Sequence, residues 1–214
     1  LYYRVNAPAP VVKARVIGQN QGLQIMVYAK DRPDLFVAIC AYFDQHTLSI
    51  QDARIHTTRH GWALDSFIVL LPEHDTDYRS WASLVEHELA DALQTAMPGT
   101  AEAQRPVAGR MSRRSRVFPI VPNVELQPDE NSKSWRLAVT ASDRPGLLYS
   151  LAQVFARHDI NLQMAKVLTL GDRVEDVFII QGDALEPPRA QLQFERNLLG
   201  RLSDTPSPTM AQSL

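Results

Sequence analysis

The sequence has almost no cysteine and no long apolar run. Cys40 is the only cysteine among 214 residues, which excludes a disulfide framework and favours a reducing compartment, the cytoplasm. No window approaches the roughly 18 consecutive apolar residues that a membrane span needs, and no signal-peptide pattern begins the chain. The formal net charge is only −2, which gives no indication of a surface for nucleic acid or membrane. We therefore expect neither of them among the partners.

The chain does contain a duplication. The segment LQIMVYAKDRPDLFVAICAYFDQHTLSIQDARIHT from Leu23 aligns with WRLAVTASDRPGLLYSLAQVFARHDINLQMAKVLT from Trp135, with Asp31 opposite Asp143. Matches further along are Asp65 with Asp176 and Phe67 with Phe178. The unit is too long for a solenoid repeat. A chain with 45% hydrophobic residues can form two small cores, so we expect two duplicated domains.

Each copy shows the same order of periodic segments. Alternating apolar residues predict strands, and the i, i+1, i+4, i+7, i+8 stripe after DRP predicts a helix. The segments expected in the first copy are a strand at 23–29, a helix at 35–43, strands at 48–58 and 62–71, and a helix at 77–96. Those expected in the second are a strand at 135–141, a helix at 147–155, strands at 160–170 and 174–181, and a helix in RAQLQFERNLLGRL. This order indicates an α+β fold of two tandem ferredoxin-like (βαββαβ) domains.

The edges of the two domains are less regular. A strand at about 118–127 is expected to close the first unit, whereas the second copy shows no obvious last strand. VVKARVI at 11–17 has strand character, and we hypothesise that it pairs with one of the sheets, because open edges are usually covered. The expected boundaries are 1–22 for a leader, 23–127 for the first domain, 128–134 for a linker, 135–203 for the second domain and 204–214 for a disordered tail.

The stretch DRPGLL predicts a helix start that can face a small anion. A Pro in the first turn lacks only an N–H that has no helical partner. Asp143 can accept hydrogen bonds from the first amides, and Gly146 allows another group to approach the backbone closely. The amides of Leu147 and Leu148 would then point outward as donors. We expect a shallow pocket for an amino acid or a similar acid, with an ordinary helix start as the alternative.

The strand, DRPGLL, the helix, HDINLQMAKV and VEDVFII together resemble an ACT domain, a small-molecule-sensing module of metabolic enzymes. In that family the ligand lies between the loop after the first strand and the second strand of a neighbouring unit. The binding residues that the resemblance implies are Asp143, Gly146, Leu147, Leu148, Asn161 and Gln163 in the second copy, and Asp31, Asp34, Leu35, Phe36, Ser49 and Gln51 in the first. Because Asp34 replaces Gly and would repel a carboxylate, the second loop is the better site.

The tandem pair DRPDLF and DRPGLLY resembles, over residues 20–203, the C-terminal tandem ACT region of the bacterial PII uridylyltransferase/uridylyl-removing family. This implies a regulatory module that binds L-glutamine at the ACT–ACT interface and switches an attached enzyme modifying the PII protein. The nucleotidyltransferase and hydrolase domains would lie upstream, which fits a chain whose first residue is Leu. The resemblance implies Mg²⁺ for that enzyme. For this chain we expect no cofactor and, because no nucleophile–base pair, phosphate loop or metal set is evident, no catalytic residue. PII protein or a second copy of the chain are further partners.

Other chemistry has weaker support. HELAD at 87–91 has Asp where a zinc-protease motif needs its second His, so we expect an exposed helix face and no metal site. RNA-recognition folds share the strand order but need exposed aromatics, and DARIHTT and QMAKVLT offer none. GRMSRRSR at 109–116 is expected to be a solvated loop or a contact for an acidic protein patch. The alternative function is a protein-interaction or dimerisation platform without its own ligand.

Overall fold

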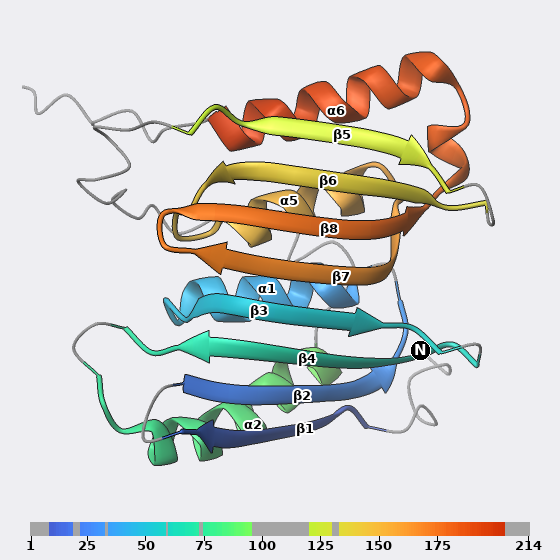
Figure 1. Ribbon diagram of the computed structural model, residues 1–214. Helices are drawn as coiled ribbons and strands as arrows, with labels where there is room; N and C mark the ends of the chain where they lie inside the picture. Colours follow the sequence, from blue (N-terminus) through green and yellow to red (C-terminus); the bar gives the residue numbers. More distant parts are fainter. Residues whose placement is uncertain are drawn as a thin grey trace, which may run out of the picture.

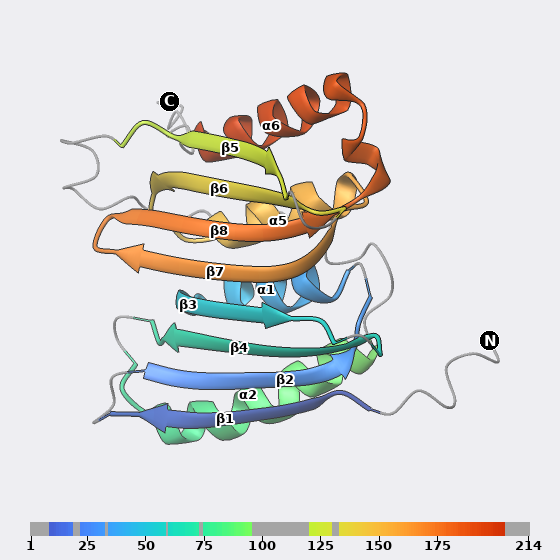
Figure 2. The same ribbon diagram turned by 45° about the vertical axis from the view of Figure 1, so that its right-hand side comes forward.

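The computed structural model describes residues 9–18, 22–32, 34–58, 60–72, 75–95, 120–129 and 133–203. Their strands form one antiparallel sheet of eight, in the order β1-β2-β4-β3-β7-β8-β6-β5, and Figures 1 and 2 show the helices on one face of it. The strands are β1 (Val11–Ile17), β2 (Gly22–Lys30), β3 (Ser49–His56), β4 (Trp62–Leu70), β5 (Asn123–Pro128), β6 (Trp135–Ser142), β7 (Asn161–Leu170) and β8 (Arg173–Gln181). The helices are α1 (Leu35–Gln45), α2 (Tyr78–Thr95), α5 (Leu147–Arg157), the short η2 (Asp183–Leu185) and α6 (Pro188–Ser203).

The alternation in the sequence becomes the two faces of this sheet. Leu23, Ile25 and Val27 are fully buried under the helices, whereas Met26 and Tyr28, which flank Val27, are more than two-fifths exposed on the helix-free face. Period-two burial is what a sheet covered on only one side requires. The expected α+β, ferredoxin-like class is confirmed.

The two copies lie side by side and share the sheet. β3 of the first pairs with β7 of the second in an antiparallel register from Asp52 opposite Leu168 to His56 opposite Met164. Behind this junction α1 packs against α5. The helices are therefore buried on two sides: Cys40 and Ala41 of α1, outside the stripe expected to face the sheet, are at most 4% exposed.

The edge strand precedes each unit rather than following it. β1 pairs with β2, which confirms the strand hypothesised at 11–17. β5 pairs with β6 of the second unit, so the expectation that 118–127 closes the first unit is wrong. The segment 128–134 thus joins two strands of one unit instead of linking the copies. A strand just before β6 can pair with it as an antiparallel hairpin, which needs only a short connection.

Helices α1 and α5 end in the same way. After α1 the N–H of Leu48 donates to the carbonyl of Phe43 at 2.8 Å, and after α5 the N–H of Ile160 donates to Phe155 at 2.9 Å. These are Schellman closures, which need a left-handed residue just past the helix. The residues that take this conformation are Thr47, with φ 55°, and Asp159, with φ 53°.

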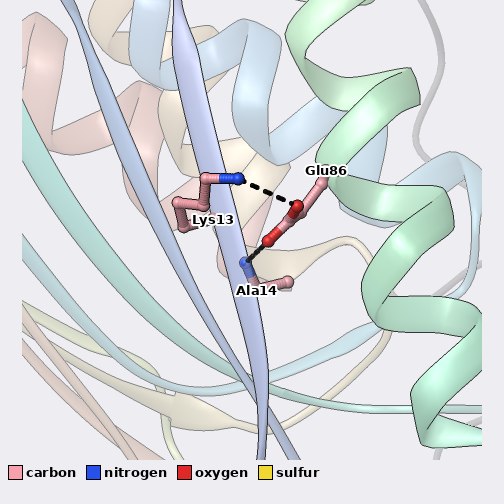
Figure 3. Close-up of polar contacts among 3 residues, drawn as sticks. All are labelled: Lys13, Ala14 and Glu86. Carbon is pink, nitrogen blue, oxygen red and sulfur yellow. Dashed lines mark hydrogen bonds and ion pairs between the residues drawn. The ribbon is translucent and has the colours of Figure 1, made fainter.

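The outer edge of the first unit is held by a carboxylate. Figure 3 shows Glu86 of α2 reaching β1, where Oε1 accepts the N–H of Ala14 at 2.8 Å and Oε2 meets Lys13 Nζ at 3.2 Å. Such a contact occupies a backbone donor that an edge strand would otherwise present to other chains.

Candidate ligand site between the two units

The arginine of each DRP motif binds the second helix of its own unit. Arg32 Nη2 donates to the carbonyl of Leu93 at 3.2 Å, and Arg144 Nη2 donates to Arg201 at 2.6 Å. Each guanidinium therefore satisfies a carbonyl near the end of the second helix of its unit. Backbone hydrogen bonds to the neighbouring β-turns hold both loops alike, from Asp31 N to Gly61 O at 2.9 Å and from Asp143 N to Asp172 O at 2.8 Å.

The start of α5 differs from the expected one. The residue before the helix is Gly146, with φ 72°, and no side chain caps the helix, so Asp143 does not cap it. The N–H of Leu147 donates to Arg144 O at 3.2 Å and is not the outward donor expected. The N–H of Leu148, also in the first turn, remains a candidate donor for a ligand. A left-handed φ at Gly146 explains why this loop contains glycine.

The first loop takes another conformation. Asp34, at the position of Gly146, has φ −95°. Its Oδ1 lies 3.1 Å from Arg32 Nε, so the carboxylate is engaged within its own loop. Asp34 lines neither of the two cavities described next.

A cavity of about 210 Å³ lies where the second loop meets the first unit. The sequence-predicted residues that line it are Asp143, Gly146, Leu147 and Leu148 from the second unit and Ser49 from the first. The fold thus brings one predicted loop to the predicted strand of the neighbouring unit. Residues that sequence reasoning missed also line it, among them Cys40, Asp44, Thr47, Arg144, Tyr149, Thr169 and Asp176.

The equivalent place at the first loop is almost filled. Asp31, Leu35, Phe36 and Asn161 lie together there around a cavity of only about 20 Å³. A cavity of this size has room for about one water, which needs roughly 10–15 Å³ of such volume, and for no larger ligand. Phe36 stands where the larger cavity has Leu148, and its ring takes up more space. The two duplicated sites have therefore diverged into one open and one closed.

Two predicted glutamines make contacts elsewhere. Gln51 Nε2 donates to Ser49 Oγ at 2.8 Å and does not line the cavity. Gln163 Oε1 accepts the hydroxyl of Ser134 at 3.0 Å, and its Nε2 donates to Gln181 Oε1 at 2.5 Å. Gln163 therefore ties β7 to the end of β8 and to Ser134, the residue before β6.

Acidic groups dominate the charge of the larger cavity. Asp176 is only 2% exposed, and burial raises its pKa to about 7, although its Oδ1 accepts the N–H of Leu168 at 3.2 Å. Burial also raises the pKa of Asp143, whose charge adds to the effect on Asp176. Buried carboxyls with raised pKa values favour a cationic partner, such as an ammonium group. The sequence signal for Asp176 was its match with Asp65 in the duplication.

The other sequence candidates that lie within the described residues form no metal site. Among the described residues no group of three or more His, Cys, Asp or Glu could hold a metal ion. His87 and Asp91 are exposed on α2. Searching the same residues finds no helix suited to cross a bilayer. The run at 109–116 and the tail at 204–214 lie outside the described residues.

Known proteins are similar to this chain both in its second unit and over nearly its whole length. Residues 135–196 match the ACT domain family. The bifunctional uridylyltransferase/uridylyl-removing enzyme of Bordetella pertussis is 60% identical over 204 residues, 95% of this chain and 24% of that enzyme. The enzyme of the same name from Burkholderia orbicola is 51% identical over 93% of this chain and 23% of its own length. The chain thus spans about a quarter of the length of the curated relatives it matches.

Among solved structures, an aspartate kinase from Synechocystis aligns with 86% of this chain and 27% of its own, at 17% identity and a TM-score of 0.46. That likeness is too weak to carry an argument. The bifunctional enzymes are far more similar in sequence, at 60% and 51% identity over 95% and 93% of this chain. The chain is similar to one part of the bifunctional uridylyltransferase/uridylyl-removing enzymes, a tandem ACT region, and this confirms the resemblance drawn from its sequence.

Proposed function

We propose that this chain is a regulatory module that binds L-glutamine in the larger cavity and thereby switches an attached uridylyltransferase/uridylyl-removing enzyme that modifies the PII signalling protein. ACT domains are ligand-sensing regulatory folds, and the relatives carry that enzyme's name. The observation that carries the proposal is a cavity of about 210 Å³ lined by both units. A ligand there would contact both, which is what a switch of their arrangement requires.

The lining suits a small zwitterion. The first-turn amide of Leu148 can donate to a carboxylate, because helix N-termini favour anions. Asp143 and Asp176 offer carboxyls to an ammonium group, and Thr169 offers a hydroxyl that can pair with a side-chain amide. The acidic lining adds partners for an ammonium group to the anion site expected at the helix start.

The mechanism would be linkage between binding and domain arrangement. If L-glutamine binds one arrangement more tightly, it shifts the population toward that arrangement. A coupling of about 1–3 kcal/mol would make the ligand affinities of the two arrangements differ roughly 5- to 150-fold. A Kd near 1 mM, suited to an abundant metabolite, corresponds to about −4.1 kcal/mol. The catalytic domains, their Mg²⁺ and the contact with PII would belong to the attached enzyme, in the cytoplasm.

A protein-interaction platform is the second candidate, and the helix-free face of the sheet favours it. Met26, Tyr28, Leu64 and Met164 are each 42–52% exposed there. Tyr28 also stacks on Trp62, with ring centroids 4.9 Å apart. Exposed apolar residues gathered on one face are typical of docking surfaces.

A thermal-unfolding titration of the chain tests the proposal, with L-glutamate and D-glutamine as controls. L-Glutamine alone is expected to raise the midpoint saturably. Gly146→Asp and Ser49→Phe, on opposite walls of the cavity, are expected to abolish the shift. Asp34→Asn, at the closed first loop, is the matched control and is expected to keep it.

Calorimetry is expected to give one site per chain, because only one of the duplicated cavities is open. No response to tens of millimolar L-glutamine would contradict the proposal. If sedimentation then showed association that Met26→Lys and Leu64→Lys abolish, the interaction platform would take its place.

A further inference from the structure

A second hollow, of about 310 Å³, lies on the surface of the second unit between α5 and α6. It shares no residue with the cavity between the units. The polar residues that line it, with Gly200, are Arg157, His158, Arg196, Asn197 and Arg201. Three guanidinium groups thus face one space, and no carboxylate is among the described residues that line it.

The first unit provides an internal comparison for this hollow. His158 Nε2 lies 2.8 Å from Asn197 Nδ2, and His46 Nε2 lies 3.6 Å from Glu88 Oε2. The two histidines are matched in the duplication, and each ends the first helix of its unit. Asn197 and Glu88 therefore occupy equivalent places on the second helices of the two units. This match pairs the other residues around His158 with those around His46.

At five equivalent positions around the two histidines, the residue in the second unit is more positively charged than the residue in the first. The equivalent residues are Gln45, His87, Glu88, Asp91 and Ala92 in the first unit and Arg157, Arg196, Asn197, Gly200 and Arg201 in the second. With histidines neutral, the formal charge of the set changes from −2 to +3. Because both units have the same fold, packing alone does not require the arginines.

The first unit fills the space that the second leaves open. The hydroxyl of Tyr42 donates to Glu88 Oε2 at 3.2 Å, and the ring of Tyr42 lies 4.3 Å from that of His46. The duplication places Val154 at the position of Tyr42. The smaller side chain and the absence of a side chain at Gly200 enlarge the hollow in the second unit.

Helix electrostatics explain only part of this pattern. Arg157 and Arg201 lie in the last turns of α5 and α6, where a cation is favourable. Arg196 lies farther from the end of α6, and the dipole does not account for the loss of both acids. Like charges gathered around one hollow favour an anion as its occupant.

We propose that this hollow binds a small phosphate-bearing anion. Guanidinium groups suit this chemistry, because their planar donors form paired, charge-assisted hydrogen bonds with phosphate oxygens. Asn197 Oδ1 accepts from Gln193 at 3.0 Å, and this contact orients the amide at the rim. An anion held by arginines of both helices ties α5 to α6 at a place remote from the cavity between the units.

Calorimetry of the 214-residue chain with sodium pyrophosphate tests the proposal, in sodium chloride adjusted to constant ionic strength. Inorganic phosphate and citrate are compared in parallel. Saturable binding of pyrophosphate, weaker for phosphate and weakest for citrate, is the expected result. Heats no larger than those of chloride, or citrate binding more tightly than pyrophosphate, would overturn it.

Gly200→Asp restores the acid that the first unit carries, and Gly200→Ala is the matched uncharged control. A Cβ at Gly200 meets nothing within 4 Å, so both variants are expected to fold. Pyrophosphate affinity is expected to fall about tenfold in Gly200→Asp and in Arg196→Gln, and to be unchanged in Gly200→Ala. Equal affinity in Gly200→Asp and Gly200→Ala would show that the anion binds elsewhere. A retained L-glutamine response in each variant shows that it folds. If the wild type bound pyrophosphate but not L-glutamine, the proposed function would fail and the anion site would still be supported.

Discussion

Glu86 and Ala14, 72 residues apart, are joined by a hydrogen bond of 2.8 Å between a helix carboxylate and the backbone of an edge strand. The bond holds β1 against α2 and closes the first unit at its outer edge. Lys13 adds an ion pair to the same carboxylate, but its side chain is 71% exposed. The backbone bond is therefore the stronger of the two contacts.

Glu86→Ala is expected to lower the free energy of unfolding by about 1 kcal/mol in urea titrations at pH 7. Glu86→Gln keeps an acceptor for Ala14 and should lose less, as should Lys13→Ala. The hydrogen bond from Ala14 lowers the pKa of Glu86. Its contribution is present above the ordinary pKa of glutamate and is lost as pH falls through the lowered value. The wild type and Glu86→Ala should therefore converge in acid, and a constant difference would contradict this.

Asp65 and Asp176 are expected to make the protein less stable as pH rises. Burial raises the pKa of both to about 7 in the folded chain, from 3.8. The folded state therefore binds more protons between these values, so stability falls as pH increases from about 4 to about 7. Asp65→Asn and Asp176→Asn should each make the free energy of unfolding depend less on pH. The loss of stability that each variant avoids at pH 8 is up to about a few kcal/mol.

The test is denaturant unfolding of both variants between pH 5 and pH 8. Asparagine can still accept the backbone N–H groups of His56 and Leu168, which bond to the aspartates at 3.3 and 3.2 Å. Asp183→Asn, on the exposed turn before α6, is the control and should leave the slope unchanged. Unaltered slopes in both buried-site variants would contradict the raised pKa values.

Two glycines are expected to respond to alanine with opposite signs. Gly146 has φ 72°, so Gly146→Ala should cost about 1–2 kcal/mol of stability through backbone strain. Gly200 lies inside α6 with open space around it, so Gly200→Ala should add about 0.5–1 kcal/mol. Thermal unfolding of both variants without ligand makes the comparison, and equal effects would contradict it.

The two units are expected to unfold together, because they share one sheet and α1 packs on α5. Trp62 and Trp81 lie in the first unit and Trp135 in the second. Fluorescence of a Trp135→Phe variant then reports the first unit, and that of a Trp62→Phe, Trp81→Phe variant reports the second. Coincident urea midpoints, after correction for the stability of each variant, are expected. Two separate transitions would mean that the β3–β7 junction adds little stability.

Much of the fold could be predicted because the signals are local. Strand alternation around Val27 and Val139 and the helix stripes after each DRP need only the neighbouring residues. The exchange of Gly146 for Asp34 predicted the second loop as the better ligand site, and the cavity of about 210 Å³ lies at that loop. The capping role assigned to Asp143 was wrong, because the loop turns once more, at Gly146, before α5 begins.

The sequence by itself determined the duplication, the type of each helix and strand, and the loop residues of the candidate site. Only the tertiary structure decided which sheet edges β1 and β5 fill, that β3 joins β7, and that one cavity is open while its counterpart is closed. Strand partners depend on which distant edge is free, and cavity volume depends on how side chains such as Phe36 and Leu148 pack. Neither is encoded in periodicity, because both arise from contacts between residues far apart in the chain.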